Sequence, residues 1–245
     1  MEKVRLSVVI PAYNEEKRIG KTLGEISDYL KKQEYQSEIL VVDDGSKDRT
    51  AQVVKELQRK IENLRLLEYE DRKNRGKGFA TRYGMLQAKG KFRLLSDADH
   101  STPISEIEKF WPEFEQGFDI VLGSREIKGA VLDPPQGPWR RFVGEGFKIY
   151  RKLILGMWEI QDTQCGFKCF RDEVVEKIFP KCKINRFAFD PEILILAKKA
   201  GYKIKEVPIY WRNDPHSKVK FKHIFNMAFD ILKIKWNLLT KKYEL

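Results

Sequence analysis

Short, continuous apolar runs alternate with segments of helical spacing along the first half of the chain, and this alternation limits the possible folds most strongly. The apolar runs predict strands over Leu6–Ile10 (stopped by Pro11), Glu38–Val42, Leu64–Tyr69, Phe92–Ser96 and Asp119–Gly123. The segments between them predict helices over Ile19–Leu30, Asp48–Ile61, Gly78–Ala88 and Ile104–Phe114. Strands that are apolar on both faces are typical of a parallel sheet covered by helices on both sides. We therefore expect an α/β fold built on a mostly parallel sheet.

The second half is less regular. It predicts a proline-rich mobile loop over Ala130–Pro138, strands over Gly166–Phe170 and Ile204–Ile209, and helices over Phe142–Trp158, Pro191–Ala200 and Val219–Lys241. One face of the last helix is predicted to be polar: Lys222, His223, Asn226, Asp230, Lys233, Asn237 and Lys241. The opposite arc is apolar: Phe221, Ile224, Phe225, Ile231, Leu232, Trp236, Leu238 and Leu239. We expect one domain over residues 1–218 and, over residues 219–245, a basic amphipathic helix that is not a separate domain.

The charge balance favours anionic partners. Lys and Arg number 47 against 36 Asp and Glu, a formal net charge of +11 at pH 7, which suits phosphates, nucleotides, nucleic acid or an acidic membrane surface.

No run of about 18 apolar residues predicts a transmembrane helix, and the first residues show no apolar signal region. The three cysteines, Cys165, Cys169 and Cys182, predict reduced thiols in a cytoplasmic protein.

Polar segments follow three of the predicted strands: Tyr13–Glu15, Asp43–Ser46 and Asp97–Asp99. In sheets of this kind, ligands bind beyond the carboxyl ends of the strands. We therefore expect the three segments to meet at one edge of the sheet and to form the functional site.

Asp97 and Asp99 flank a small residue, an arrangement that can hold a hard divalent cation and leave positions for water and substrate phosphates. A surface turn with a helix cap has the same short pattern, so the pair alone leaves both interpretations open, and its place at the sheet edge favours the metal. The Asp43–Ser46 segment is also open. It suits either a plain strand–turn–helix junction or a carboxylate that hydrogen-bonds a base or ribose.

The segment Asn74–Gly78 combines two glycines with cations. It can bring backbone N–H groups and a lysine against phosphate oxygens, or it can be a solvated basic turn. It lacks the longer glycine-rich stretch of a Walker A loop, and the chain has no GxGxxG segment. Dinucleotide cofactors are therefore not expected.

Five segments in order resemble the inverting glycosyltransferases of family 2: PAYNE (Pro11–Glu15), VVDDGSKDRT (Val41–Thr50), NRGKG (Asn74–Gly78), DAD (Asp97–Asp99) and GSR (Gly123–Arg125). The resemblance implies a GT-A type fold, whose parallel sheet binds a nucleotide sugar beside a DxD metal site. Four later segments resemble dolichyl-phosphate β-glucosyltransferases: DTQCGFK (Asp162–Lys168), RFAFDPEIL (Arg186–Leu194), EVPIYW (Glu206–Trp211) and HSK (His216–Lys218). The resemblance runs from about Leu6 to Lys218, nearly the whole chain.

The resemblance implies a role for each matching residue. The nucleotide pocket would be lined by residues after the first two strands, with the last of them reading the base: Pro11, Ala12, Tyr13, Glu15 and Asp43. Lys77 and Asp97 would hold the ribose or the diphosphate. Asp99 would be the principal ligand of the metal, with Asp97 beside it.

The remaining roles concern the reacting groups. Arg125 and Lys218 would face the diphosphate and the acceptor phosphate, and Asp162 would orient the donor sugar or the acceptor. Asp190 and Glu192 would brace the site from the start of a helix.

Two positions depart from the pattern of these relatives. His216 stands where they often carry glycine, and His100-Ser101-Thr102 follows the DAD segment where they often have acidic or small polar residues. We expect His100 to lie at the surface or behind the metal rather than to ligate it, because hard cations prefer oxygen.

The resemblance implies transfer of glucose from UDP-glucose, with Mg²⁺ or Mn²⁺, to a polyprenyl (dolichyl-type) phosphate with inversion at the anomeric carbon. The acceptor phosphate is mostly ionised at neutral pH, so alignment and charge stabilisation matter more than a strong base. A GDP-mannose donor, a soluble glycan acceptor and a non-catalytic nucleotide-sugar sensor remain alternatives. Nucleic acid is not expected as a partner, because aspartates end the strands where phosphates would have to approach without metal.

A lipid acceptor requires contact with a membrane. Residues 134–160 and 220–245 carry formal charges of +3 (five Lys or Arg, two acids) and +4 (six Lys, two acids) and form broad apolar arcs edged with cations. Such helices suit the surface of an anionic membrane, here its cytoplasmic face. The alternative is that both arcs pack onto the catalytic domain or onto a second subunit. The oligomeric state is left open.

Overall fold

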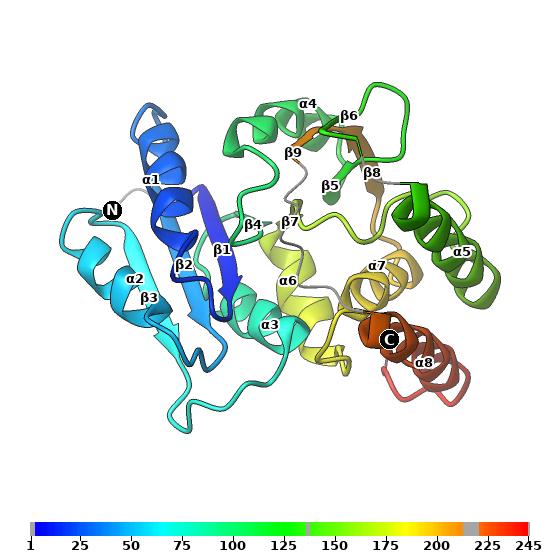
Figure 1. Cartoon of the computed structure of the whole chain (residues 1–245). Coiled ribbons are helices and arrows are strands. Elements are labelled where there is room, and N and C mark those ends of the chain that lie inside the picture. The colour runs from blue at the N-terminus through cyan, green and yellow to red at the C-terminus, as the bar shows by residue number, and fades with distance from the viewer. Residues whose placement is uncertain (1–2, 136–137, 213–220, 245) are drawn as a thin grey trace.

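A seven-stranded sheet forms the centre of the computed structural model, which describes residues 3–135, 138–212 and 221–244 (Figure 1). The strand order is β3-β2-β1-β4-β7-β5-β8. The strands are β1 (Leu6–Ala12), β2 (Ser37–Asp43), β3 (Leu64–Glu68), β4 (Phe92–Leu95), β5 (Ile120–Ser124), β7 (Lys168–Arg171) and β8 (Ile204–Pro208). Every neighbouring pair is parallel except the two that β7 makes. The expected α/β fold with a mostly parallel sheet is confirmed.

Helices cover both faces of this sheet (Figure 1). One face carries α1 (Ile19–Leu30), α2 (Thr50–Gln58), the 3-10 helix η1 (Ile104–Lys109) and α4 (Trp111–Glu115). The other carries α3 (Lys77–Gln87), α5 (Pro138–Leu155), α6 (Asp172–Ile178), the 3-10 helix η2 (Phe179–Lys181), α7 (Phe189–Lys199) and α8 (Phe221–Leu239). Successive side chains of a strand point to opposite faces. Val8 and Ile10 therefore pack into the first core and Val9 into the second, which is why this strand is apolar throughout.

The antiparallel direction of β7 brings the loop before it to the carboxyl edge of the sheet. In the register of the sheet, Lys168 pairs with Leu95 at the carboxyl end of β4 and with Leu122 on β5. Because β7 runs against its neighbours, its amino end lies at their carboxyl edge. The loop before β7, residues 156–167, therefore enters the edge where the polar segments of β1, β2 and β4 end.

Several predicted boundaries are wrong. Strand β1 continues through Pro11 in register with β2, since an extended proline fits a strand where no N–H is needed. The expected loop over 130–138 contains a short strand, β6 (Val131–Asp133), which pairs in parallel with β9 (Tyr210–Arg212). Helix α6 has no counterpart in the sequence prediction, and the helix expected over 104–114 is divided between η1 and α4.

Helices α5 and α8 pack against each other, and the Tyr150 hydroxyl donates a hydrogen bond to the Ala228 carbonyl at 3.1 Å. The wheel predicted for α8 is only partly right. Ile231 of the apolar arc is buried, but so is Asn237 of the predicted polar face, whereas Trp236 of the apolar arc is 61% exposed. The apolar arc is therefore split between an inner part in the core and an outer part in solvent.

Candidate active site

The loops after β1 and β2 are joined by hydrogen bonds at the carboxyl edge. The amide of Asn14 donates to Ser46 Oγ (3.0 Å), and the amide of Lys47 donates back to Asn14 Oδ1 (2.8 Å). The amide of Glu15 donates to Thr50 Oγ1 at 2.7 Å. Asn14 has a φ of 56°, a left-handed conformation that asparagine tolerates. The expectation that these two polar segments meet is confirmed.

Asp43 and Asp44 have different functions in the structure. The Asp44 carboxylate accepts hydrogen bonds from the side chain of Asn74 (2.8 Å) and from the amides of Arg75 (2.8 Å) and Gly76 (2.9 Å). It therefore holds the glycine-rich segment to the end of β2. Asp43 is 5% exposed, and among the described residues nothing donates a hydrogen bond to its Oδ1. Burial also raises the pKa of Asp43. Because buried polar atoms are normally hydrogen-bonded, Oδ1 is a position that a hydrogen-bond donor of a ligand would satisfy.

The glycine-rich segment presents Lys77 to the end of β4. Lys77 Nζ lies 2.6 Å from Asp97 Oδ1. Burial opposes the charge of the lysine, but the carboxylates of Asp97 and Asp190 together raise the pKa of Lys77 above its ordinary value. The lysine therefore remains a cation at the position where phosphate oxygens are expected.

Asp97 also packs against Gly166, which lies in the loop before β7. A Cβ on Gly166 would lie 1.9 Å from Asp97 Oδ2, a separation that no side chain tolerates. Gly166 is needed here for close approach, because its backbone packs directly against the carboxylate.

Asp99 makes longer contacts with its charged neighbour than Asp97 does. Its Oδ1 accepts a hydrogen bond from the Ser101 amide at 3.0 Å, and its Oδ2 lies 4.0 Å from Arg18 Nη1. Burial and then the charge of Asp97 raise the pKa of Asp99. A divalent cation would relieve this repulsion.

A second pair of opposite charges joins β5 to the loop before β7. Arg125 binds Asp162 through two parallel hydrogen bonds, Nε to Oδ2 at 2.7 Å and Nη2 to Oδ1 at 2.9 Å. Burial alone would raise the pKa of the Asp162 carboxyl, but Arg125 outweighs it and lowers the pKa to about 2. Glu206 on β8 fixes the same loop by accepting the amides of Gln161 (2.7 Å) and Asp162 (2.8 Å).

A third pair lies deeper. Lys168, at the start of β7, is 2.6 Å from Asp190 on α7, and both side chains are buried. Burial raises the pKa of Asp190, opposed by the charges of Lys168 and Lys77. Through this pair the first turn of α7 supports the site, as expected for Asp190.

His100 is engaged by protein groups at both ring nitrogens. Its Nε2 accepts the amide of Ile104 at 3.0 Å, which places the proton on Nδ1, 2.6 Å from Glu25 Oε2. Burial lowers the pKa of His100, so the ring is neutral near pH 7. His100 is 6% exposed and is a buried support rather than a surface residue, and neither nitrogen is available to a metal.

The other predicted residues have varied positions. Pro11 and Ala12 are buried at the end of β1, whereas Tyr13 is 36% exposed. Glu15 is held by Arg18 through Oε2 at 2.8 Å and Oε1 at 3.0 Å. The remaining predicted residue, Lys218, lies outside the described residues, as does His216.

The sequence predicts no role for Glu206 or Gly166, and it predicts no difference between Asp44 and Asp43. A detectable signal exists for Glu206, because it is an acidic residue inside a strand pattern. The role of Gly166 depends on a contact with Asp97, 69 positions away in the chain, and no local pattern reports such a contact.

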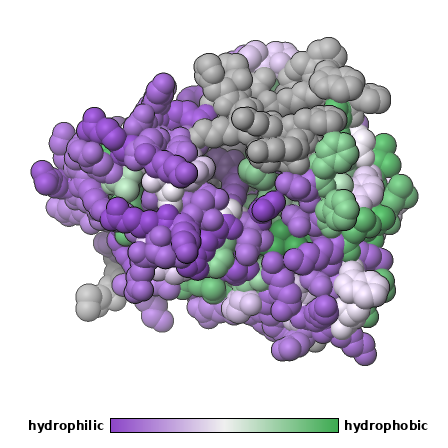
Figure 2. All heavy atoms as spheres, turned by 60° about the horizontal axis from the view of Figure 1, so that its bottom comes forward, coloured by the Kyte–Doolittle hydropathy of each residue, from purple (hydrophilic) through white to green (hydrophobic). Residues whose placement is uncertain are grey.

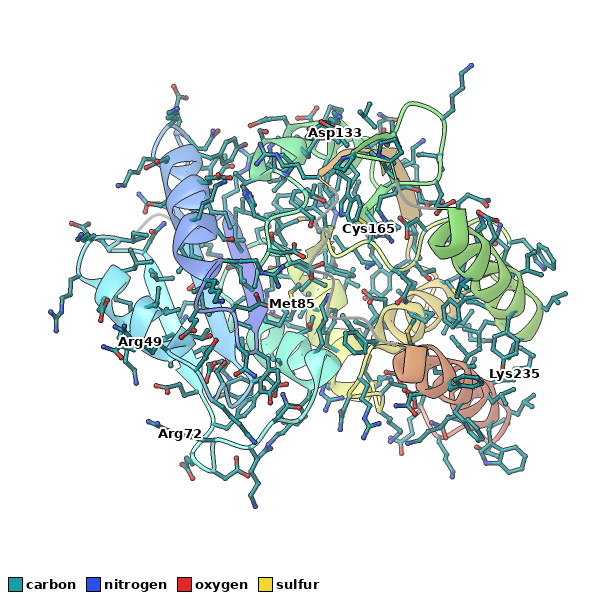
Figure 3. All side chains as sticks on the ribbon, in the orientation of Figure 1. Arg49, Arg72, Met85, Asp133, Cys165 and Lys235 are labelled. Atoms are coloured by element: carbon teal, nitrogen blue, oxygen red, sulfur yellow. The ribbon has the colours of Figure 1, made fainter. Side chains whose placement is uncertain are left out.

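The three cysteines are free and buried, as expected for reduced thiols. Figure 3 shows Cys165 near the middle of the molecule, on the loop before β7, and Lys235 far from it on α8. Burial raises the pKa of Cys165 to about 12, so its thiol is protonated and unreactive at neutral pH.

Two carboxylates do not complete a metal site by themselves. In the described part of the chain, no group of three or more His, Cys, Asp or Glu side chains is disposed to hold a metal ion. Mg²⁺ is commonly bound by one or two carboxylates together with substrate phosphates and water. Asp97 and Asp99 fit that mode, since Asp99 has a raised pKa and both lie at the end of β4.

Comparisons with known proteins identify the family of the chain. The family model described as "Glycosyl transferase family 2" matches residues 7–179. The chain therefore belongs to glycosyl transferase family 2, and it is a glycosyltransferase.

Within this family, the chain is similar to dolichyl-phosphate beta-glucosyltransferases of several organisms. The chain is 36% identical over 260 residues to a dolichyl-phosphate beta-glucosyltransferase of Trichomonas vaginalis, covering 98% of this chain and 78% of that one. It is 35% identical to the dolichyl-phosphate beta-glucosyltransferase of Saccharomyces cerevisiae (99% and 78% covered) and 34% identical to that of Homo sapiens (98% and 78% covered).

Solved structures show the same fold. Glucosyl-3-phosphoglycerate synthase from Mycobacterium tuberculosis, in complex with Mn²⁺, UDP and glucosyl-3-phosphoglycerate, superposes with a TM-score of 0.70 at 17% identity, covering 99% of this chain and 81% of that one. Mannosyl-3-phosphoglycerate synthase from Rubrobacter xylanophilus gives 0.69 at 19% identity, covering 99% and 76%. The expected GT-A type fold is therefore confirmed.

Proposed function

We propose that the chain transfers glucose from UDP-glucose to a polyprenyl phosphate of the dolichyl type and inverts the anomeric carbon. The observation that carries the proposal is the identity of 34–38% to dolichyl-phosphate beta-glucosyltransferases along 88–99% of the chain. The charged edge of the sheet supports it, since cations and carboxylates alternate there as a diphosphate and a metal would require.

Asp43 is the residue that we propose reads the base. Its Oδ1 is buried and lacks a donor among the described residues, and an N–H on the edge of uracil supplies one. Ala12 pairs with Asp43 in the register of β1 and β2, and Pro11, Ala12, Tyr13 and Glu15 are proposed to line the nucleotide pocket beside it. Lys77, which stays charged, would bind the diphosphate.

A divalent cation, Mg²⁺ or Mn²⁺, would be held by Asp99 with Asp97 beside it. When bound, it neutralises charge on the departing diphosphate. Asp97 is already bound to Lys77 and packed on Gly166. We therefore give Asp99 the main part in holding the ion.

Arg125 and Asp162 act as a unit in this proposal. With a pKa of about 2 and both oxygens bound to Arg125, Asp162 cannot serve as a base near neutral pH. Asp162 instead orients Arg125 so that the guanidinium faces the phosphates. An acceptor phosphate that is already ionised needs no base, and Lys218 is proposed as its second cation.

We further propose that the enzyme acts from a membrane surface, on the cytoplasmic side. None of the helices that the structure describes is long and apolar enough to cross a bilayer. Figure 2 shows green apolar side chains gathered where α5 and α8 lie, while the opposite side is hydrophilic. The exposed residues include Leu153, Phe229, Trp236 and Leu239, and Lys235 borders an apolar hollow of about 450 Å³ between the helices. An apolar surface edged with lysine suits an anionic bilayer.

The domain boundary remains a proposal. Residues 1–218 would form the catalytic domain, with residues 219–245 as an appended helix that is not an independent unit. Ile231 and Ile234 of α8 are buried in the same core as Leu194 of α7, which supports the proposal that the helix is not an independent unit.

The direct test is a donor and acceptor screen. Radiolabelled UDP-glucose, UDP-galactose and GDP-mannose are each offered with a short polyprenyl phosphate, or with a soluble glycan, in the presence of Mn²⁺. We expect label in the organic phase from UDP-glucose alone, and loss of product with EDTA. Lipid-linked product from GDP-mannose alone, or label found only in a soluble glycan, would overturn the proposal.

A further inference from the structure

Glu192 on α7 is a fully buried carboxylate that none of the proposed reaction steps uses. It is 0% exposed and accepts three hydrogen bonds. Two come from the backbone before α7: the Lys183 amide to Oε1 and the Ile184 amide to Oε2, both at 2.9 Å. The third comes from the Tyr243 hydroxyl, 2.7 Å from Oε1 and 51 positions along the chain. Glu192 thus joins the C-terminal segment to the loop over 183–186.

The loop over 183–186 packs against the glycine-rich segment Asn74–Gly78. The Asn185 carbonyl accepts the amide of Phe79 at 3.1 Å, and a Cβ on Gly76 would lie only 2.4 Å from the same oxygen. A Cβ on Gly78 would lie 2.7 Å from the Ile184 carbonyl oxygen. The two backbones are therefore in contact on both sides of Lys77, and a shift of the loop must move Lys77.

Tyr243 is fixed to α8 as well as to Glu192. It is 2% exposed, and its hydroxyl accepts a long hydrogen bond of 3.4 Å from Asn237 Nδ2. The amide of Lys242 donates to the Asn237 carbonyl at 2.9 Å. Asn237 is the buried polar residue that the helical wheel placed on a solvent-facing side, and this contact explains its burial. The end of α8 is thereby connected to Lys77 through Tyr243, Glu192 and the loop.

We propose that Glu192 and Tyr243 are positioning residues that use the end of α8 to fix the loop under Gly76–Gly78, and thereby set the affinity of Lys77 for a nucleoside diphosphate. The inference rests on the proposed function for the place of Lys77 beside the diphosphate. It adds that nucleotide affinity depends on the C-terminal segment, which contains none of the proposed reacting groups.

The test is a titration with UDP and with GDP, each with Mn²⁺, by calorimetry on the full chain. Tyr243→Phe removes one hydroxyl and keeps the ring. We expect the dissociation constant of the nucleotide that the wild type binds to rise about threefold to tenfold, with hydrogen exchange faster at the amides of Lys183 and Ile184. Tyr29→Phe is the matched control, since the Tyr29 hydroxyl on α1 also donates to a glutamate, Glu108 on η1, but at the surface.

The outcomes separate the inference from the proposed function. A wild type that binds GDP and not UDP rejects the donor assignment, and the Tyr243→Phe comparison then proceeds with GDP. Unchanged nucleotide affinity in Tyr243→Phe, with or without a lower melting temperature, overturns the inference, because a merely structural contact would change stability alone. Binding of neither nucleotide by the wild type overturns both. Glu192→Gln, which keeps the shape and loses the charge, is expected to weaken the same nucleotide in the same direction.

Discussion

The carboxyl edge of the sheet and the outer face of α5 and α8 are built in opposite ways. At the edge, opposite charges are matched in partly or fully buried positions: Lys77 lies 2.6 Å from Asp97, and Arg125 lies 2.7 Å from Asp162. On the outer face of the two helices, large apolar side chains are exposed, and Phe229 is 76% exposed. The first region pairs opposite charges with each other, and the second exposes large apolar side chains to water.

The difference separates two tasks. Groups held in fixed pairs need little reorganisation when charge develops in a reaction, which is the main way in which a polar site lowers a barrier. A contiguous exposed apolar surface on a monomer instead marks a place where another phase or partner binds. Changes at the edge should therefore affect catalysis without affecting membrane binding, and changes on the outer face should do the reverse.

The largest effect is expected from Asp99→Asn. The substitution removes the carboxylate that is best placed for the metal and leaves the fold intact, so turnover should fall by about 1,000-fold while vesicle binding is unchanged. Steady-state kinetics with Mn²⁺ and vesicle cosedimentation measure the two. Asp28→Asn, an exposed position on α1, is the control. Equal activity of the two variants would reject a metal-centred site.

Gly166→Ala tests how closely the edge is packed. The added Cβ would lie 1.9 Å from Asp97 Oδ2, so either the Asp97 side chain or the loop before β7 must shift, and we expect a loss of kcat/KM of about 100-fold. Gly24→Ala is the matched control, since a Cβ there meets nothing within 4 Å. A fully active Gly166→Ala enzyme would show that the position of Asp97 is not critical.

The edge could be predicted largely from sequence because its residues come directly after strands. Once a run such as Leu6–Ile10 is taken as a buried parallel strand, the residues that follow it must lie at the carboxyl edge. The DAD segment after β4 and the polar residues after β1 and β2 were located in this way. Local order along the chain sufficed, because each strand carries its own segment to the same edge.

The helical face could not be predicted in the same way. A helical wheel identifies apolar residues on α8, but it does not tell that Ile231 packs inward while Trp236 stays 61% exposed. That division depends on where α5 and α7 lie. The antiparallel direction of β7 and the link from Glu192 to Tyr243 likewise depend on contacts between distant positions, which have no periodic signature.

The outer face is tested by the double variant Trp236→Ser, Leu239→Ser. Both side chains are exposed on α8, at 61% and 67%, and their removal should weaken partitioning onto anionic vesicles by about 30-fold. Activity on a water-soluble short-chain acceptor should be unchanged. Leu86→Ser, on the exposed side of α3, is the control. Equal vesicle binding by the double variant and this control would remove α8 as the membrane contact.

The smallest effect concerns the acid stability of the edge. The pKa of Asp162 is about 2 in the folded protein against an ordinary value of 3.8, so the folded state binds its proton less readily than the unfolded state. The stability that Asp162 contributes is therefore fully present above about pH 4 and is lost as pH falls towards 2. The difference in unfolding free energy between wild type and Asp162→Asn should shrink by about 1 kcal/mol between pH 4 and 2.5.

Asp43→Asn gives the opposite sign and completes this test. Burial raises the pKa of Asp43 above its ordinary value of 3.8, so the folded form takes up a proton more readily than the unfolded chain. Wild type should therefore gain stability relative to the variant as pH falls towards about 4, and the gain should level off below that pH. Urea unfolding at several pH values measures both differences. Parallel slopes for the two variants would mean that Arg125 does not hold the Asp162 charge, and that the matched pairing of charges at the edge differs from the one described.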